Sequence, residues 1–497
     1  MRKLLASLVV VVAGLGNASA AMANDGGLDT SWGGTGIVRI GRSDYDFVPH
    51  VSPYGPSGVQ VIGNFDSAGS GGPYDATVLM RFTVDGGPDP SCGGTGRVSF
   101  AGVDPVSASD MVVLDDGSTI VVGTIESSQP QGLILKYTPT CQLDPTFGSG
   151  GVVSFISREG VRFSSVDIRD HDRIVVGGLT LFAPVDGGDS RLTVARFTSS
   201  GQLDTSFGAQ NDGVFVSDGT REGRVSDLKV DSLGRVLFVG IQNLGTDDDA
   251  VVGRLTNTGR LDSSFASAGW FTRTGVNIDR FSATALRANG GLIAVGVHES
   301  TGFVATLVCL DALGAIDNTC GTSGVVNQLA LPSGVVDFRF WTVVVDDMGR
   351  FVISGIYDDP YASGSGVTPM VVRLLADGSP DPTFGSGGLI SAQFTPGHAS
   401  HVALDQLGRI LVSGHEFVPN GFHGPIVRLT ASTTTSTTTT TSTSTTTTTS
   451  VPNTSTIAPQ LLPATGDDAS GSWAVVVMAL GLGLLLVRRY AVNHSAK

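Results

Sequence analysis

Short apolar segments of strand length follow one another along most of the chain. In one clear stretch, residues 162–168 alternate apolar and polar side chains, and residues 173–177 form a continuous apolar run. Residues 193–197 and 213–216 are two further segments of this kind, and turn-forming residues separate all four. Short strands at this spacing predict an all-β fold, and four strands per unit are typical of a β-propeller blade.

A short motif, Asp-x-Ser/Thr-Phe-Gly, precedes the fourth strand of each unit. Successive copies are separated by 55 to 64 residues, and such a period over most of a chain indicates a repeat architecture. In each copy the aspartate lies two positions before a Ser or Thr, where its carboxylate can close an Asx-turn on its own backbone. The seven motif aspartates are Asp29, Asp89, Asp144, Asp204, Asp262, Asp317 and Asp381.

The two ends of the repeat region complement each other. A fourth-strand segment, residues 37–40, comes before any first strand. The last unit has a first strand at 401–404, a second at 409–413 and a third at 425–429, but no fourth. Pairing of the first segment with the last unit closes a ring and removes exposed sheet edges. We therefore expect a seven-bladed β-propeller over residues 24–430, with six complete blades and one split blade.

Most units carry a basic residue on the third strand, eight positions before the motif aspartate, and an aromatic residue three positions after it. We expect each cation to lie over the aromatic ring. One unit has Cys309 and Cys320 at these two positions, which favours a disulfide between them in an exported protein. Cys92 and Cys141 are then left to pair with each other. The basic residues are Arg81, Lys136, Arg196, Arg254, Arg373 and Arg428, and the aromatic residues are Trp32, Phe147, Phe207, Phe265 and Phe384.

Composition bears on function more than on fold. The chain of 497 residues carries a net charge of −15 and has no Lys/Arg cluster in its repeat region, so nucleic acid is not an expected partner. The sequence has no GxSxG, HExxH or GxxxxGK[ST] motif of the common catalytic and phosphate-binding sites. Paired catalytic carboxylates on different blades stay open as an alternative.

The N-terminus has the pattern of a secretory signal peptide. Arg2 and Lys3 precede an apolar run over residues 4–15, and small residues with the AxA pattern follow. We expect residues 1–23 to be removed, with cleavage after Ala23 or, as an alternative, after Ala20. The apolar run is short for a membrane helix.

The C-terminus combines a spacer with an anchor. Residues 431–461 are mostly Thr and Ser, have little apolar surface to bury, and are expected to form a disordered stalk. Residues 462–497 contain LPATG, an apolar run at 473–487 and the pair Arg488-Arg489. This order resembles the sorting signal of sortase-anchored surface proteins of Gram-positive bacteria. The resemblance implies cleavage between Thr465 and Gly466 and attachment to cell-wall peptidoglycan; a single C-terminal membrane anchor is the alternative.

The repeats themselves resemble the delta-60 repeat family of bacterial surface and secreted proteins, which is similar to NHL-type propellers. The resemblance covers residues 28–430 through the seven copies of the Asp motif. It implies a β-propeller fold and an exported protein. The family has no single activity, so the resemblance implies none for this chain.

A ligand site is expected where loops vary from unit to unit. The connections between second and third strands, and between one unit and the next, differ in length and lie on one face, called the loop face here. Four histidines of the last unit map there beside Glu416 as presumed loop residues and could hold zinc, although solvent-facing histidines are the simpler interpretation. These histidines are His398, His401, His415 and His423; residues 247–249 and 358–359 are alternative calcium ligands.

Two hypotheses of function follow. The first is a surface-anchored, non-catalytic scaffold with a monomeric body that needs no cofactor and binds a protein or glycan through the loop face. The second is an extracellular hydrolase or lyase that uses a metal or acidic residues on that face. The lack of a catalytic motif favours the first.

Overall fold

The computed structural model describes residues 25–430 apart from short gaps. Contacts divide the chain into two units, Met1–Thr434 and Thr435–Lys497, and the second unit lies outside the described residues. The expected signal peptide, stalk and LPATG segment are likewise not described. No helix in the described part of the chain is long and apolar enough to span a bilayer. The gaps are 41–45, 67–73, 75, 103, 170–172, 183–188, 219–221, 244–247, 274–278, 300–302, 327–336, 359–366, 393, 395–396 and 419–420.

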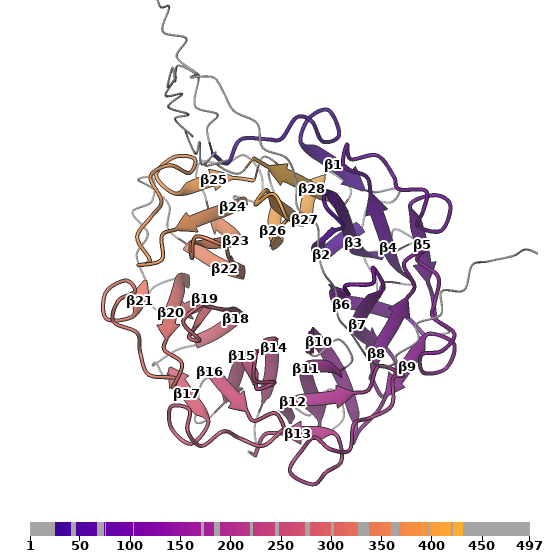
Figure 1. The fold of residues 1–497 in the computed structure, drawn as a ribbon, viewed down its shortest axis with the longest axis vertical. Coiled ribbons are helices and arrows are strands. Elements are labelled where there is room, and N and C mark those ends of the chain that lie inside the picture. Colours follow the sequence, from indigo (N-terminus) through magenta and orange to yellow (C-terminus); the bar gives the residue numbers. More distant parts are fainter. Residues whose placement is uncertain are drawn as a thin grey trace, which may run out of the picture. The chain divides into compact units, whose positions relative to one another are not determined.

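Seven four-stranded antiparallel sheets surround a central axis, which confirms the expected seven-bladed propeller (Figure 1). Blades 1 to 3 consist of β2 (Asp46–Tyr54), β3 (Gly58–Phe65), β4 (Ala76–Phe82) and β5 (Arg97–Phe100); β6 (Val106–Val113), β7 (Thr119–Ile125), β8 (Gln131–Tyr137) and β9 (Val152–Phe155); and β10 (Gly160–Arg169), β11 (Arg173–Leu181), β12 (Ser190–Phe197) and β13 (Val214–Val216).

Blades 4 to 6 continue the same order around the axis. They consist of β14 (Gly223–Val230), β15 (Val236–Asn243), β16 (Asp248–Leu255) and β17 (Trp270–Arg273); β18 (Asp279–Leu286), β19 (Leu292–Glu299), β20 (Phe303–Leu310) and β21 (Val325–Val326); and β22 (Asp337–Val345), β23 (Phe351–Asp358), β24 (Val367–Leu374) and β25 (Leu389–Ser391). The first strand of every blade lies innermost, beside the axis (Figure 1).

Blade 7 is the split blade. Its strands β26 (Gly397–Leu404), β27 (Ile410–Val418) and β28 (Gly421–Leu429) are completed by β1 (Ile37–Ile40) from the other end of the chain. β1 pairs with β28 antiparallel. The residues before β1 add to this closure, because Asp25 forms an ion pair with Arg373 and its carbonyl accepts a hydrogen bond from Gly385 N at 3.1 Å.

Seven apolar clusters hold the ring together, one between each pair of neighbouring blades. The cluster between blades 3 and 4, for example, joins Val194 and Phe207 to Leu228 and Phe238, all with side chains fully shielded from solvent. Because both faces of each blade are covered, the second and third strands are continuous apolar runs, as in other doubly buried strands. This is why their apolar sequences predicted strands so well.

Each motif aspartate closes the expected Asx-turn. Its Oδ1 accepts the backbone N–H two residues ahead at 2.9–3.1 Å in all seven copies. Two residues beyond that amide, a backbone N–H donates to a carbonyl of the neighbouring blade at 2.7–3.2 Å, again in all seven. The motif is therefore a clamp between blades as well as a turn.

The expected cation–aromatic contacts are present and accompany an ion pair. In blade 4, Arg254 lies 4.6 Å from the Phe265 ring centroid and its Nε is 2.8 Å from Asp262 Oδ2. Arg81 instead lies over Tyr54, at 3.6 Å, because Cys92 occupies the aromatic position of its unit. Lys136, Arg196, Arg373 and Arg428 have the same arrangement as Arg254, at 4.5 to 6.0 Å from their rings.

The structure joins Cys309 to Cys320 and Cys92 to Cys141. In blade 5, Arg287, in the turn that follows the first strand β18, pairs with Asp317, which has lost its usual third-strand arginine. The first disulfide therefore substitutes for a packing contact, while another arginine supplies the charge.

We expect the variant C309R/C320F to keep most of the stability that C309S/C320S loses. Removal of a disulfide with a sequence separation of 11 residues costs about 3 kcal/mol by the loop-entropy relation. Arg and Phe restore the contact found in the other blades. Urea unfolding of both variants measures the difference. Equal stability of the two variants would contradict the idea that the disulfide replaces the cation–aromatic contact.

Candidate binding funnel on the propeller axis

All seven innermost strands contain a bulge at the same position. In blades 2 to 7 a glycine of the second strand lies beside it, and a Cβ there would meet a carbonyl oxygen of the innermost strand at 1.8–2.1 Å. The bulge turns one extra side chain toward the axis, as bulges next to functional sites do. These glycines are Gly123, Gly178, Gly240, Gly296, Gly355 and Gly414.

Three rings of side chains follow from this geometry. The bulge residues form a bulge ring, which consists of Pro49, Ser109, Ser164, Ser226, Ser282, Trp341 and Ser400. The residues after them form a stitch ring of His50, Asp110, Ser165, Asp227, Ala283, Thr342 and His401. Two positions before the bulge residues, toward the loop face, lies a mouth ring of Phe47, Ser107, Arg162, Arg224, Arg280, Arg339 and His398.

Polar residues of the stitch ring bind one blade to the next, whereas Ala283 in blade 5 has no polar side chain to do so. Asp110 Oδ2 accepts Val166 N at 2.8 Å, and Asp227 Oδ2 accepts Thr284 N at 2.9 Å. Thr342 Oγ1 accepts Val402 N at 3.0 Å in the same manner. These acceptors satisfy backbone groups beside the bulges, which buried structure requires.

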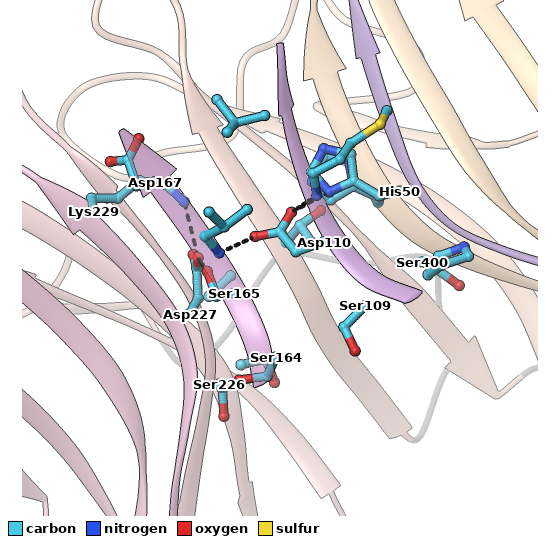
Figure 2. Close-up of a pocket in the computed structure, with 18 of the residues that line it drawn as sticks. His50, Ser109, Asp110, Ser164, Ser165, Asp167, Ser226, Asp227, Lys229 and Ser400 are labelled. Atoms are coloured by element: carbon cyan, nitrogen blue, oxygen red, sulfur yellow. Dashed lines mark hydrogen bonds and ion pairs between the residues drawn. The ribbon is translucent and has the colours of Figure 1, made fainter. Parts of the chain in front are cut away.

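Between blades 1 and 2 the stitch is an imidazole–carboxylate pair. His50 Nδ1 lies 2.6 Å from Asp110 Oδ1, and Figure 2 shows the two side chains joined at the wall of the channel. Burial raises the pKa of Asp110, but His50 and Lys229 together lower it by more. The net pKa is below its ordinary value, so the carboxylate stays charged. The His401 ring stacks on His50 with 3.7 Å between centroids, which continues the contacts from blade 7 to blade 1.

Lys229 neutralises part of the acidic charge. Its Nζ lies 2.9 Å from Asp227 Oδ1. Burial lowers the pKa of Lys229, but Asp227, Asp167 and Asp110 raise it more, so the ammonium stays charged. Three carboxylates face one lysine, and their oxygens are already occupied by backbone amides, His50, Ser165 and Lys229.

A cavity of about 330 Å³ lies among these residues and is called the chamber here. Serines of the bulge ring line it, and Figure 2 shows Ser109, Ser164, Ser226 and Ser400 around the same space. The hydroxyls of Ser109, Ser226, Ser282 and Ser400 have no hydrogen-bond partner among the described residues. The chamber wall therefore offers hydroxyl groups that are free to bond a ligand, and carboxylates whose oxygens already accept hydrogen bonds from the protein.

A second cavity, of about 390 Å³, lies toward the loop face and is called the mouth. One wall is aromatic: Trp341 stacks on His398 at 6.4 Å, and His398 contacts His415 at 4.3 Å. His415 in turn meets the edge of Phe47 at 5.4 Å. Arg224 lines the same cavity.

Arg224 differs from its neighbours in the mouth ring. Arg162 is paired with Glu126 and Arg280 with Asp248, whereas Arg224 is exposed and makes no ion pair with a described residue. Desolvation and the nearby Arg280 lower the pKa of the Arg224 guanidinium, which nonetheless stays cationic because arginine titrates far above neutral pH. Asp248 and Glu222 act on Arg224 in the opposite direction, although neither forms an ion pair with it. The mouth thus presents a cationic group without a direct counter-ion beside aromatic rings.

The four predicted histidine ligands all belong to strands of blade 7. The placement of His398, His415 and His423 in loops was therefore wrong, whereas His401 lies within the expected first strand. The strands extend beyond their apolar segments because β26, β27 and β28 keep pairing at their polar ends, with His398 opposite His415 and Glu416 opposite His423. His401 stacks on His50 instead. No group of three or more His, Cys, Asp or Glu in the described residues is arranged to hold a metal ion.

The aspartates that were suggested as alternative calcium ligands have other roles where the structure describes them. Asp248 pairs with Arg280, and Asp249 is buried in β16. Asp247 and Asp359 lie outside the described residues. The motif aspartates serve the inter-blade clamps already described. The expected sortase residues, Thr465 and Gly466, are outside the described residues too.

We expect stability to fall with acidification between about pH 6.5 and 4.5, before most carboxylates titrate. Burial and then His398 lower the pKa of His415 to about 3, and burial and then His50 lower that of His401 well below 6.5. The unfolded chain therefore binds protons that the folded chain does not, so stability is lost as the pH falls through this window.

Urea unfolding at several pH values measures this slope, which reaches at most about 1.4 kcal/mol per pH unit for each histidine. The variant His415→Phe keeps the aromatic wall and should reduce the slope. An unchanged slope in this variant would count against the assignment.

Sequence reasoning missed the bulge, stitch and mouth rings. A signal was present, because each second strand contains a glycine after an apolar run, as in 175–178 and 238–240, with one serine between the run and the glycine in blades 6 and 7. A glycine inside a strand marks a bulge or a close backbone approach. Aligning the first strands on these glycines brings Arg162, Arg224, Arg280 and Arg339 into register.

Comparison with known proteins agrees with the architecture. A family described as "Domain of unknown function (DUF5122) beta-propeller" matches residues 172–207 and 349–384, which belong to blades 3 and 6. Each match runs from the second strand to the Phe of the Asp motif. No curated protein matches the chain.

Solved structures resemble the chain only distantly. They include polysaccharide lyase Uly1 (8% identity, TM-score 0.43, covering 77% of this chain and 90% of that one). A protein of unknown function from Dyadobacter fermentans has 14% identity, a TM-score of 0.41 and coverages of 79% and 98%. The gluconolactonase XC5397 from Xanthomonas campestris has 13% identity, a TM-score of 0.34 and coverages of 79% and 100%. The chain is a β-propeller repeat protein, with two of its blades matched by the DUF5122 propeller family.

Proposed function

We propose that this protein is a surface-displayed binding protein that takes an acidic sugar in the mouth of its funnel. The observation that carries the proposal is Arg224, an unpaired guanidinium in a cavity whose opposite wall consists of Trp341, His398, His415 and Phe47. A guanidinium binds a carboxylate through two parallel hydrogen bonds. The C–H faces of a sugar ring are apolar and pack on aromatic rings.

The size and position of the mouth fit this role. A cavity of about 390 Å³ falls within the range of small-molecule sites. It opens at the loop face, where the sequence varies most between repeats. A signal peptide at 1–23 and either sortase attachment at Thr465 or a membrane anchor belong to the same proposal, since they place the propeller outside the cell.

We expect Arg224→Gln to weaken binding of methyl galacturonoside by about tenfold or more, since a charged hydrogen bond contributes about 1.5–3 kcal/mol. Trp341→Ala should weaken it as well, by removing a stacking surface. Isothermal titration of the full-length chain measures both effects. Arg97→Gln is the matched control, because Arg97 lies on the outer strand β5 over Phe65. Equal affinities in all variants would refute the site.

Catalysis is the second candidate, and the His50–Asp110 pair is the observation that favours it. An imidazole held by a buried carboxylate has the geometry of a general base and its orienting group. The same pair, however, fills the position at which other blades have an inter-blade stitch. We therefore give binding precedence, and product analysis after long incubation with the same sugars tests turnover.

A further inference from the structure

The mouth and the chamber form one funnel. Pro49, Ser226, Ser282 and Ser400 line both cavities, so the bulge ring is the boundary at which they meet. A ligand held at Arg224 therefore has the chamber directly below it. The two compartments differ in chemistry, because the mouth is cationic and aromatic while the chamber is hydroxylic and acidic.

The chamber is suited to neutral hydroxyl groups. Ser109, Ser226, Ser282 and Ser400 can each donate one hydrogen bond and accept others, and none is engaged with a described residue. Sugar hydroxyls have the same double capacity and match such a wall. The cavity of about 330 Å³ lies at the lower end of the range for small-molecule sites, which suits a single monosaccharide.

The chamber is unsuited to a second acid. Asp110, Asp167 and Asp227 outnumber Lys229 among the charged residues that line it. His50 offsets part of this charge at Asp110, and burial raises the pKa of Asp167. Like charges at close range in a partly buried site cost free energy. Hydrogen bonds to the protein hold these carboxylates in place at the chamber wall. They therefore repel an anion that enters the chamber.

We propose that the chamber binds a neutral sugar ring joined to the acidic sugar held at Arg224, so that the propeller selects an acidic–neutral disaccharide unit over a run of acids. This inference rests on the proposed function, because Arg224 must hold the acid first. It goes beyond that function by assigning a second subsite, its wall residues and an orientation for the ligand.

Three probes test it by titration of the full-length chain: methyl galacturonoside, a galacturonic acid–galactose disaccharide, and digalacturonic acid. The mixed disaccharide should bind about tenfold more tightly than the monosaccharide, as a few added hydrogen bonds allow. The diacid should bind no more tightly than the monosaccharide. A diacid that equals the mixed disaccharide would overturn the assignment.

Ser109 provides the matched variants, because it lines the chamber and not the mouth. Ser109→Leu narrows the chamber and should abolish the gain of the mixed disaccharide while leaving monosaccharide affinity unchanged. Ser109→Ala, which adds no volume, should reduce the affinity gain of the mixed disaccharide severalfold. This variant provides the test if Ser109→Leu does not fold. If Ser109→Ala and a folded Ser109→Leu both still bound the mixed disaccharide more tightly than the monosaccharide by the same factor as the parent chain, the subsite would be overturned.

The outcomes separate the two proposals. If no acidic sugar binds, the function proposed for the mouth fails and the subsite falls with it. If the monosaccharide binds in an Arg224-dependent manner but the mixed disaccharide gains nothing, the chamber subsite alone is refuted.

Discussion

Deletion of residues 25–40 should prevent the chain from forming a closed, soluble ring. The deletion removes β1, which is the fourth strand of blade 7, and the Asp25–Arg373 ion pair that joins this segment to blade 6. It also removes Trp32, which is fully buried between blades 7 and 1. The free edge of β28 is then a template for association with other chains. We expect aggregation or loss of cooperative unfolding, measured by sedimentation and by thermal circular dichroism.

A circular permutant provides the control. Gly26 N donates to Thr430 O at 3.1 Å and Thr430 N donates to Gly27 O at 2.8 Å, so the two segments already run side by side. Residues 25–40 attached after Thr430 through a short linker, with the turn sequence of another blade, should restore folding. A deletion variant that unfolds like the parent chain, or a permutant that fails to recover, would contradict the split-blade closure.

Replacement of Arg254 by Met should lower the free energy of unfolding by about 3–5 kcal/mol, the usual cost of removing one partner of a buried ion pair. The Arg254 side chain is 1% exposed and lies over the Phe265 ring. Burial raises the pKa of Asp262, but Ser264 and Arg254 lower it further, so the substitution leaves a carboxylate without its counter-charge. Urea unfolding measures the loss.

Lys136→Met is the matched comparison for this prediction. Lys136 pairs with Asp144 at 2.9 Å but its side chain is 18% exposed, and its ammonium lies 6.0 Å from the Phe147 centroid. Surface ion pairs contribute less than about 1 kcal/mol, and because Lys136 is partly accessible to solvent, the loss should be smaller than at the buried Arg254. Equal losses at the two positions would show that burial of the cation does not govern the strength of the clamp.

The fold was predictable because its determinants repeat. Seven copies of one motif, and apolar runs that are buried on both faces, give the same signal in each unit. The split blade followed from counting strands at the two ends. The cation–aromatic contacts were predictable from the spacing between residues such as Arg196 and Phe207, and they are present at 4.6 Å.

The funnel was not predictable to the same degree, because its residues differ from blade to blade. The stitch position is His50 in blade 1, Asp227 in blade 4 and Thr342 in blade 6, so no motif marks it. Grouping histidines by their place in the sequence brought four residues of one blade together. The structure instead pairs His401 with His50, from the other end of the chain. A site assembled around an axis takes one residue from each unit, which a reading along the sequence does not collect.

In the proposed site, Arg224 holds the carboxylate of a sugar in the mouth. A thermodynamic cycle measures this contact, with titration of methyl galacturonoside and its methyl ester against the parent chain and Arg224→Gln. We expect a coupling of about 1.5–3 kcal/mol between the guanidinium and the carboxylate, with the ester insensitive to the substitution. A coupling near zero would contradict the claim and leave the mouth without its assigned ligand.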